Sequence, residues 1–204
     1  MTKTNIIIAV FIILIAAAGA YIFVIGDDKK AVQEAADLYI KAVRDRNFDI
    51  IYNLNASSQK RRLFVLKDSS ADRDELLKRA YNEHKALFDS AQPVFGFNAI
   101  WVEKFIFITD MNYKIVDVVM ERNIDNPTAF YRKRIDAAVV VEVEYKKKDT
   151  APIYDGKNIK KAVYLVKMIH IWNITRAVKG VVVDDKWLFK GIAIQKDGNI
   201  VYWE

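Results

Sequence analysis

The stretch IDAAVVVEVEY, at residues 135–145, decides the fold class of this 204-residue chain. Apolar side chains fill every second position of it, and acids stand at the alternate positions Asp136, Glu142 and Glu144. Because successive side chains of a strand point to opposite faces of a sheet, this alternation predicts a strand with one buried face. We expect the face that carries the three acids to be solvated.

Period-two patterns continue on both sides of this stretch, from about residue 97 to the end of the chain. The other expected strands are Phe97–Thr109, Tyr113–Glu121, Lys160–Trp172, Thr175–Val183, Trp187–Gln195 and Asn199–Trp203. On the first of them Trp101, Phe105 and Phe107 would share one face. The tight turns expected between strands are Asp110–Asn112, Asp184–Asp185 and Asp197–Gly198.

Helical periodicity replaces this pattern before residue 97. The expected helices are Lys29–Arg46, Phe48–Leu54, Gln59–Leu66 and one that begins after Ser70 with Asp72, Asp74 and Glu75 in its first turn. His84 lies on the apolar side of the last helix, which is typical of a hydrogen-bonded core histidine. Helices followed by strands indicate an α+β fold, with helices packed on a curved antiparallel sheet.

An apolar run at residues 6–25, IIIAVFIILIAAAGAYIFVI, precedes this domain and contains neither charge nor proline. As a helix it would be roughly 30 Å long, which matches the hydrocarbon core of a bilayer. A cleaved signal peptide is the alternative, because Ala16–Ala20 offers small residues of the cleavable kind. The apolar run continues past such a cut, so we favour an uncleaved transmembrane anchor that binds the lipid bilayer.

The flanks of this run predict its orientation. Lys3 precedes it without an acid, whereas Asp27 and Asp28 cancel the two lysines that follow. The positive-inside rule therefore places the short tail in the cytoplasm. We expect a single-pass protein of the cell (inner) membrane, with residues 1–26 as tail and anchor and residues 27–204 as one extracytoplasmic domain.

Composition excludes several kinds of chemistry. The chain has no cysteine and two histidines, which leaves no thiolate or imidazole metal site to expect, and no cofactor motif occurs. The Ser57–Ser58 pair has no neighbouring base in the sequence. Asp117 alternates with Ile115 and Val119, so it is the one strand acid whose position allows an inward side chain, which makes it the catalytic candidate. Tyr39 and Tyr113 are its candidate partners. The favoured interpretation of Asp117 is an edge or hydrogen-bonded carboxylate.

Basic residues gather around one expected turn in a chain of net charge +6. The six lysines there are Lys146, Lys147, Lys148, Lys157, Lys160 and Lys161. Set against Asp149 and Asp155, six positive and two negative charges leave +4 at this turn. Such lysines either form a solvated loop that protects strand ends or bind anionic headgroups, an acidic polymer or an acidic partner. No aromatic residues interleave them, so we do not expect nucleic acid to bind here.

Two segments resemble a known family. The helix that carries Ala35, Leu38, Tyr39, Ala42 and Val43, followed by Asn47–Phe48 and Tyr52–Leu54, is similar to the opening of nuclear-transport-factor-2-like domains. Asp185–Phe189 resembles their late strand, although Asn47–Phe48 stands where many members carry Gly-Asp. The resemblance implies a cone-shaped domain whose open sheet face forms homodimers. Members include isomerases and dehydratases, and also a membrane-tethered assembly factor of type IV secretion systems.

From these patterns we expect a non-catalytic binding and assembly module that scaffolds an envelope protein complex with other membrane or envelope proteins. The alternative is a small-molecule-binding protein, or an isomerase- or dehydratase-like enzyme, that uses the cavity of the cone.

Overall fold

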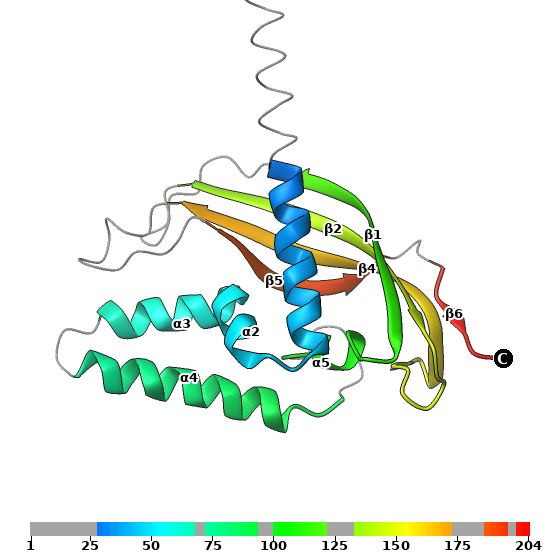
Figure 1. The fold of residues 1–204 in the computed structure, drawn as a ribbon, viewed down its shortest axis with the longest axis horizontal. Helices are drawn as coiled ribbons and strands as arrows, with labels where there is room; N and C mark the ends of the chain where they lie inside the picture. Colours follow the sequence, from blue (N-terminus) through cyan, green and yellow to red (C-terminus); the bar gives the residue numbers. More distant parts are fainter. Residues whose placement is uncertain (1–27, 68–71, 94–99, 122–132, 173–185, 196–198) are drawn as a thin grey trace, which may run out of the picture.

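The computed structural model describes residues 28–67, 72–93, 100–121, 133–172, 186–195 and 199–204. A helix at 28–44 comes first, and the further helices are α2 (Phe48–Leu54), α3 (Ala56–Lys67), α4 (Arg73–Ser90) and α5 (Glu103–Ile106). The strands are β1 (Met111–Glu121), β2 (Lys133–Tyr145), β3 (Ile153–Tyr154), β4 (Lys157–Trp172), β5 (Trp187–Ile194) and β6 (Val201–Tyr202). The chain is therefore α+β, as its pattern predicts (Figure 1).

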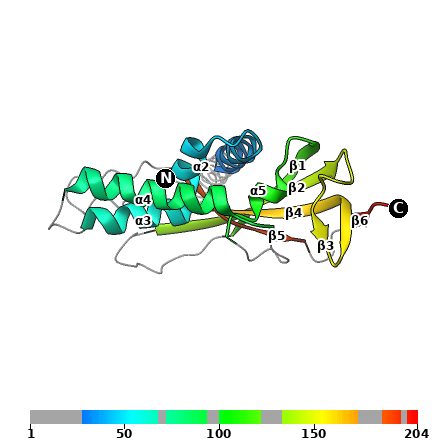
Figure 2. The same cartoon turned by 90° about the horizontal axis from the view of Figure 1, so that it is seen from below.

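One curved antiparallel sheet organises the molecule, in the order β1-β2-β4-β3. The long strand β4 also pairs with β5 along residues 164–170 and with β6 near Ile159. Figures 1 and 2 show the 28–44 helix lying across one face of this sheet. Its Tyr39 ring stacks on Phe189 of β5 with 4.1 Å between centroids, which ties the helix layer to the sheet.

Alternation along β2 holds as expected. Val139, Val141 and Val143 are at most 2% exposed, and they face the helices together with Tyr164 and Val166 of β4. Removing one such side chain from water contributes about 1.5–3 kcal/mol. The opposite face differs from the prediction at one end, where Asp136 is buried.

Short polar side chains begin the helices. Asn47 accepts a hydrogen bond from the Ile50 N–H before α2. Asn55 ends α2 and at once caps α3, because its Oδ1 accepts from the N–H groups of Ser57 and Ser58 at 3.0 and 3.1 Å. The third helix thus begins at Ala56, three residues before its expected start. Asp72 caps α4 as its position predicts.

The expected strand Phe97–Thr109 is wrong where the structure describes it. Residues 94–99 lie outside the description, Trp101 has a positive φ of 62°, and residues 103–106 form the helical turn α5. Trp101, Phe105 and Phe107 therefore do not share a strand face. A short apolar run fits a strand or a helical turn equally well, and the Phe107 N–H closes the turn on the Glu103 carbonyl at 2.8 Å.

Several other predictions are shifted or untested. Met111 and Asn112 belong to β1 instead of a turn. The expected strand Thr175–Val183 and the turns Asp184–Asp185 and Asp197–Gly198 lie outside the described residues.

The anchor at residues 6–25 also lies outside the described residues. Within the described part of the chain, no helix combines the length and apolarity needed to cross a bilayer.

Candidate functional site

A pocket of about 590 Å³ lies between β5 and the ends of α3, α4 and α5. One wall is formed by Lys190, Gly191, Ile192 and Ala193 of β5, and the opposite wall by Leu87 and residues 100–103. This volume is within the range of 300–1,000 Å³ that is usual for ligand sites.

A buried polar network borders the pocket. The Tyr39 hydroxyl donates to Glu103 Oε1 at 2.9 Å and accepts from Asn55 Nδ2 at 3.2 Å. Glu103 is only 4% exposed, Asn55 7% and Tyr39 0%. Side chains from the 28–44 helix, from α5 and from the junction between α2 and α3 therefore meet at one hydroxyl group. Glu103 and Asn55 also line the pocket.

Burial decides the protonation behaviour of this network. It raises the pKa of the Glu103 carboxyl, although hydrogen bonds from its own backbone N–H and from Tyr39 act in the opposite direction. Burial and the nearby Glu103 charge raise the pKa of Tyr39 well above its ordinary value. A carboxyl with a raised pKa beside a neutral phenol can hold or donate a proton closer to neutral pH than an exposed glutamate can.

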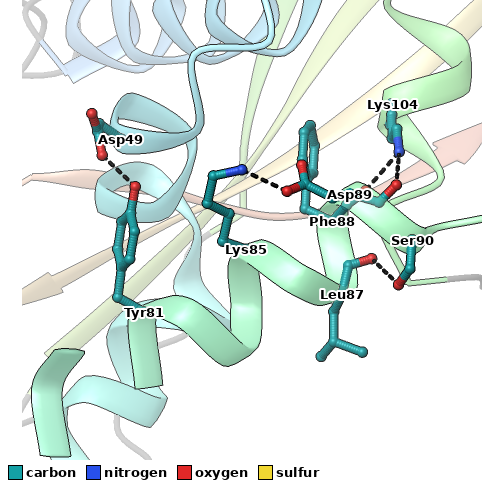
Figure 3. A network of polar contacts seen from close by, with 8 residues as sticks. All are labelled: Asp49, Tyr81, Lys85, Leu87, Phe88, Asp89, Ser90 and Lys104. Carbon is teal, nitrogen blue, oxygen red and sulfur yellow. Dashed lines mark hydrogen bonds and ion pairs between the residues drawn. The ribbon is translucent and has the colours of Figure 1, made fainter. Parts of the chain in front are cut away.

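Lys104, the residue after Glu103, is held at the end of α4 (Figure 3). Its Nζ donates to the carbonyl oxygens of Phe88 and Asp89 at 2.7 and 3.1 Å. These carbonyls lie at the C-terminal end of the helix, where a cation is favourable. Figure 3 also shows the Tyr81 hydroxyl donating to Asp49 at 2.5 Å, which links α4 to α2.

The imidazole of His84 is a base that lies close to the Ser57–Ser58 pair in space, although not in the sequence. Its Nδ1 lies 2.8 Å from Ser58 Oγ, a contact that joins α4 to α3. Burial, with a smaller effect of Arg61, lowers the pKa of His84. Ser58 is fully buried, so its hydroxyl does not face the pocket. The pair therefore fits the hydrogen-bonded structural histidine that the sequence predicts.

Asp117 does not belong to this site. It is exposed, and its Oδ1 accepts a hydrogen bond from the Val118 N–H at 2.7 Å. A register shift between Ile115 and Asp117 turns two successive residues of β1 to the solvent, which breaks the alternation that made Asp117 a catalytic candidate. Asp117 is thus the hydrogen-bonded carboxylate that was the favoured interpretation. Of its expected partners, Tyr113 donates to Asp37 and Tyr39 to Glu103.

The acids of β2 have separate environments. Glu142 is exposed, and Glu144 forms an ion pair with Lys161 at 3.1 Å. Asp136 is 8% exposed and forms an ion pair with Lys190 at 3.3 Å. The prediction that its side chain is solvated is therefore wrong.

The six lysines lie within residues 146–161, which we call the basic hairpin. β3 pairs with the start of β4 through a turn at Asp155 and Gly156, both with positive φ. Four of the lysines have local partners. These pairs are Lys147 with Asp110, Lys161 with Glu144, Lys157 with the Tyr202 ring and Lys160 with the Trp203 ring. The exposed side chains of Lys146 and Lys148 extend the positive surface.

Sequence reasoning missed Glu103 and Asn55. The available signal was a lone acid inside the apolar run WVEKFIFI, residues 101–108, and an asparagine between two helices. Among the described residues, no group of three or more His, Asp or Glu side chains could hold a metal ion.

Comparison with known proteins finds no relative of this chain. No family model, no curated protein and no solved structure matches this chain.

Proposed function

We propose that this chain is a membrane-anchored binding and assembly module of the cell envelope that acts without catalysis. Residues 6–25 anchor it in the inner membrane, the short tail lies in the cytoplasm, and the domain at 27–204 lies outside. Its partners are other membrane or envelope proteins.

One observation carries this proposal. Twenty uncharged residues end at Ile25, and the chain is already helical at residue 28. An anchor so close to a folded domain would hold that domain at the membrane surface. Surfaces of the domain would then meet proteins of the same membrane at high effective concentration.

The resemblance to nuclear-transport-factor-2-like domains supports the same function. The helices on one face of a curved sheet agree with that family's architecture. We include a homodimer through the open sheet face in the proposal. Val116 and Val119 are 41% and 46% exposed on β1, and they offer apolar area for such a contact. Lys146 and Lys148 would face anionic headgroups or an acidic partner.

Purification of the full-length protein in mild detergent, with its neighbours identified, tests this proposal. We expect a stoichiometric complex with membrane or envelope proteins that survives gel filtration. A chain that remains free of such proteins after gentle cross-linking in cells would contradict it.

The buried network favours a second candidate, a small-molecule-binding protein or an isomerase- or dehydratase-like enzyme. Glu103 would serve as the proton-transferring group and Tyr39 as its hydrogen-bonding partner, beside a pocket of suitable volume. A small molecule that co-purifies with the parent protein and is lost from an Ile192→Trp variant would favour this candidate. Purified protein that is free of small molecules would favour the assembly module.

A further inference from the structure

We propose that the pocket beside β5 is a docking groove for an extended, acidic peptide segment of a partner protein, which adds to β5 as a further strand. This inference rests on the proposed assembly function and names the kind of partner segment.

The backbone of β5 has a free edge next to the pocket. The Gln195 N–H donates to the Val163 carbonyl of β4 at 3.0 Å. Because backbone groups alternate along an antiparallel strand, Ala193 also turns its N–H and C=O toward β4. Ile192 and Ile194 therefore turn theirs to the other side. Within the described part of the chain, the only pairing on that side is the bridge between Phe189 and Asn55, further along the strand.

An apolar wall stands opposite this edge. Leu87 and Ile100 are 50% and 72% exposed, and both line the pocket together with Val102. A Cβ atom placed on Gly191 would meet no described atom within 4 Å, which shows open space over that face of the strand. An added strand needs about 4.8 Å from its neighbour. Its backbone can pair with β5 while alternate side chains contact the apolar wall.

The positive charges of Lys167 and Lys190 in the groove favour an acidic segment. Lys167 is exposed and, within the described residues, has no ion-pair partner, and Lys190 lies beside it with its side chain 44% exposed. Lys190 already contacts Asp136, so Lys167 is the freer cation. Glu103 is buried and hydrogen-bonded, and burial lowers the pKa of His84, which favours its neutral form. The accessible charge is therefore positive, which an Asp or Glu of the incoming segment would complement.

Hydrogen exchange of the full-length protein in lipid nanodiscs tests the free edge without any partner. We expect the amide protons of Ile192 and Ile194 to exchange at least tenfold faster than those of Ala193 and Gln195. Equal protection of all four amides would overturn the proposal, because the edge would then already be covered by the chain itself or by a second copy.

A peptide selection tests the occupant. The probe is a library of random twelve-residue peptides displayed on phage and selected against the full-length protein in nanodiscs. We expect enriched sequences with alternating apolar residues and at least one acid. A synthetic peptide of such a sequence should slow the exchange of Ile192 and Ile194 at least tenfold. Failure to enrich any peptide, or slowing elsewhere only, would overturn the proposal.

Substitutions on the exposed wall then locate the binding site. Ile100→Asp and Lys167→Glu should each weaken binding of the selected peptide at least tenfold. Val119→Asp is the matched control, since Val119 is a similarly exposed apolar residue on β1, far from the groove in the sheet order. Equal binding by the parent and Ile100→Asp would contradict the groove. These results do not depend on which side of the membrane the domain occupies, so they separate failure of the groove from failure of the proposed topology.

Discussion

Replacing Tyr39 by Phe removes one oxygen atom from the centre of the buried network. The ring stays the same size and can still stack on Phe189. Two buried groups lose their partner at the same time. The Glu103 carboxyl loses the hydrogen bond of 2.9 Å, and the Asn55 amide loses the acceptor at 3.2 Å.

The structure sets the size of this effect. A buried polar group left without a hydrogen bond costs about 1–3 kcal/mol, so two such groups predict a loss of about 3 kcal/mol in the free energy of unfolding. For a domain of this size, each kcal/mol lowers Tm by about 2–4 °C, so we expect Tm to fall by about 6–12 °C. The assay is thermal unfolding of the full-length protein in nonionic detergent, followed by near-ultraviolet circular dichroism.

Tyr113→Phe is the matched control. It also removes a hydroxyl that donates to a carboxylate, Asp37, at 2.6 Å. Asp37 is 34% exposed at its side chain and keeps its ion pair with Lys41, so we expect a loss below about 1 kcal/mol. Equal destabilisation by the two variants, or no effect of Tyr39→Phe, would refute the view that burial makes this network important.

Three further predictions concern charge. Burial raises the pKa of Glu103, so its contribution to stability is complete below the ordinary carboxyl pKa of 4.5 and is lost as pH rises through the folded value. Chemical unfolding from pH 4 to 8 should therefore show Glu103→Gln gaining stability relative to the parent as pH rises. Replacing Lys146–Lys148 by Gln should weaken docking of the domain on anionic nanodiscs, as reported by a dye on a single cysteine at Thr150. That loss should shrink at high salt, with Tm nearly unchanged. Asp117→Asn should change the unfolding free energy by less than about 0.5 kcal/mol and any turnover not at all, because its carboxylate faces solvent.

The fold class was predictable because its signals are local. The alternation in residues 135–145 reports directly which side chains are buried, and β2 follows it. Asp72 begins its helix as predicted because capping depends on a few neighbouring residues. The strand expected at Phe97–Thr109 failed where it is described, because the positive φ of Trp101 and the turn α5 depend on packing against α4.

The site was much less predictable, because its geometry joins distant parts of the chain. Tyr39 and Glu103 are 64 positions apart in sequence, and no local pattern pairs them. The inward alternative for Asp117 fails for a related reason. A β-bulge changes which residues face inward, and the alternating residues around Asp117 do not reveal where the register shifts.

Labelling of single cysteines in intact cells tests the proposed membrane topology most directly, because the chain has no cysteine of its own. A membrane-impermeant maleimide should label Thr150→Cys in intact cells with a permeable outer envelope, and should label Thr2→Cys only after lysis. Labelling of Thr2→Cys in intact cells, with Thr150→Cys protected until lysis, would place the domain in the cytoplasm and contradict the proposed function.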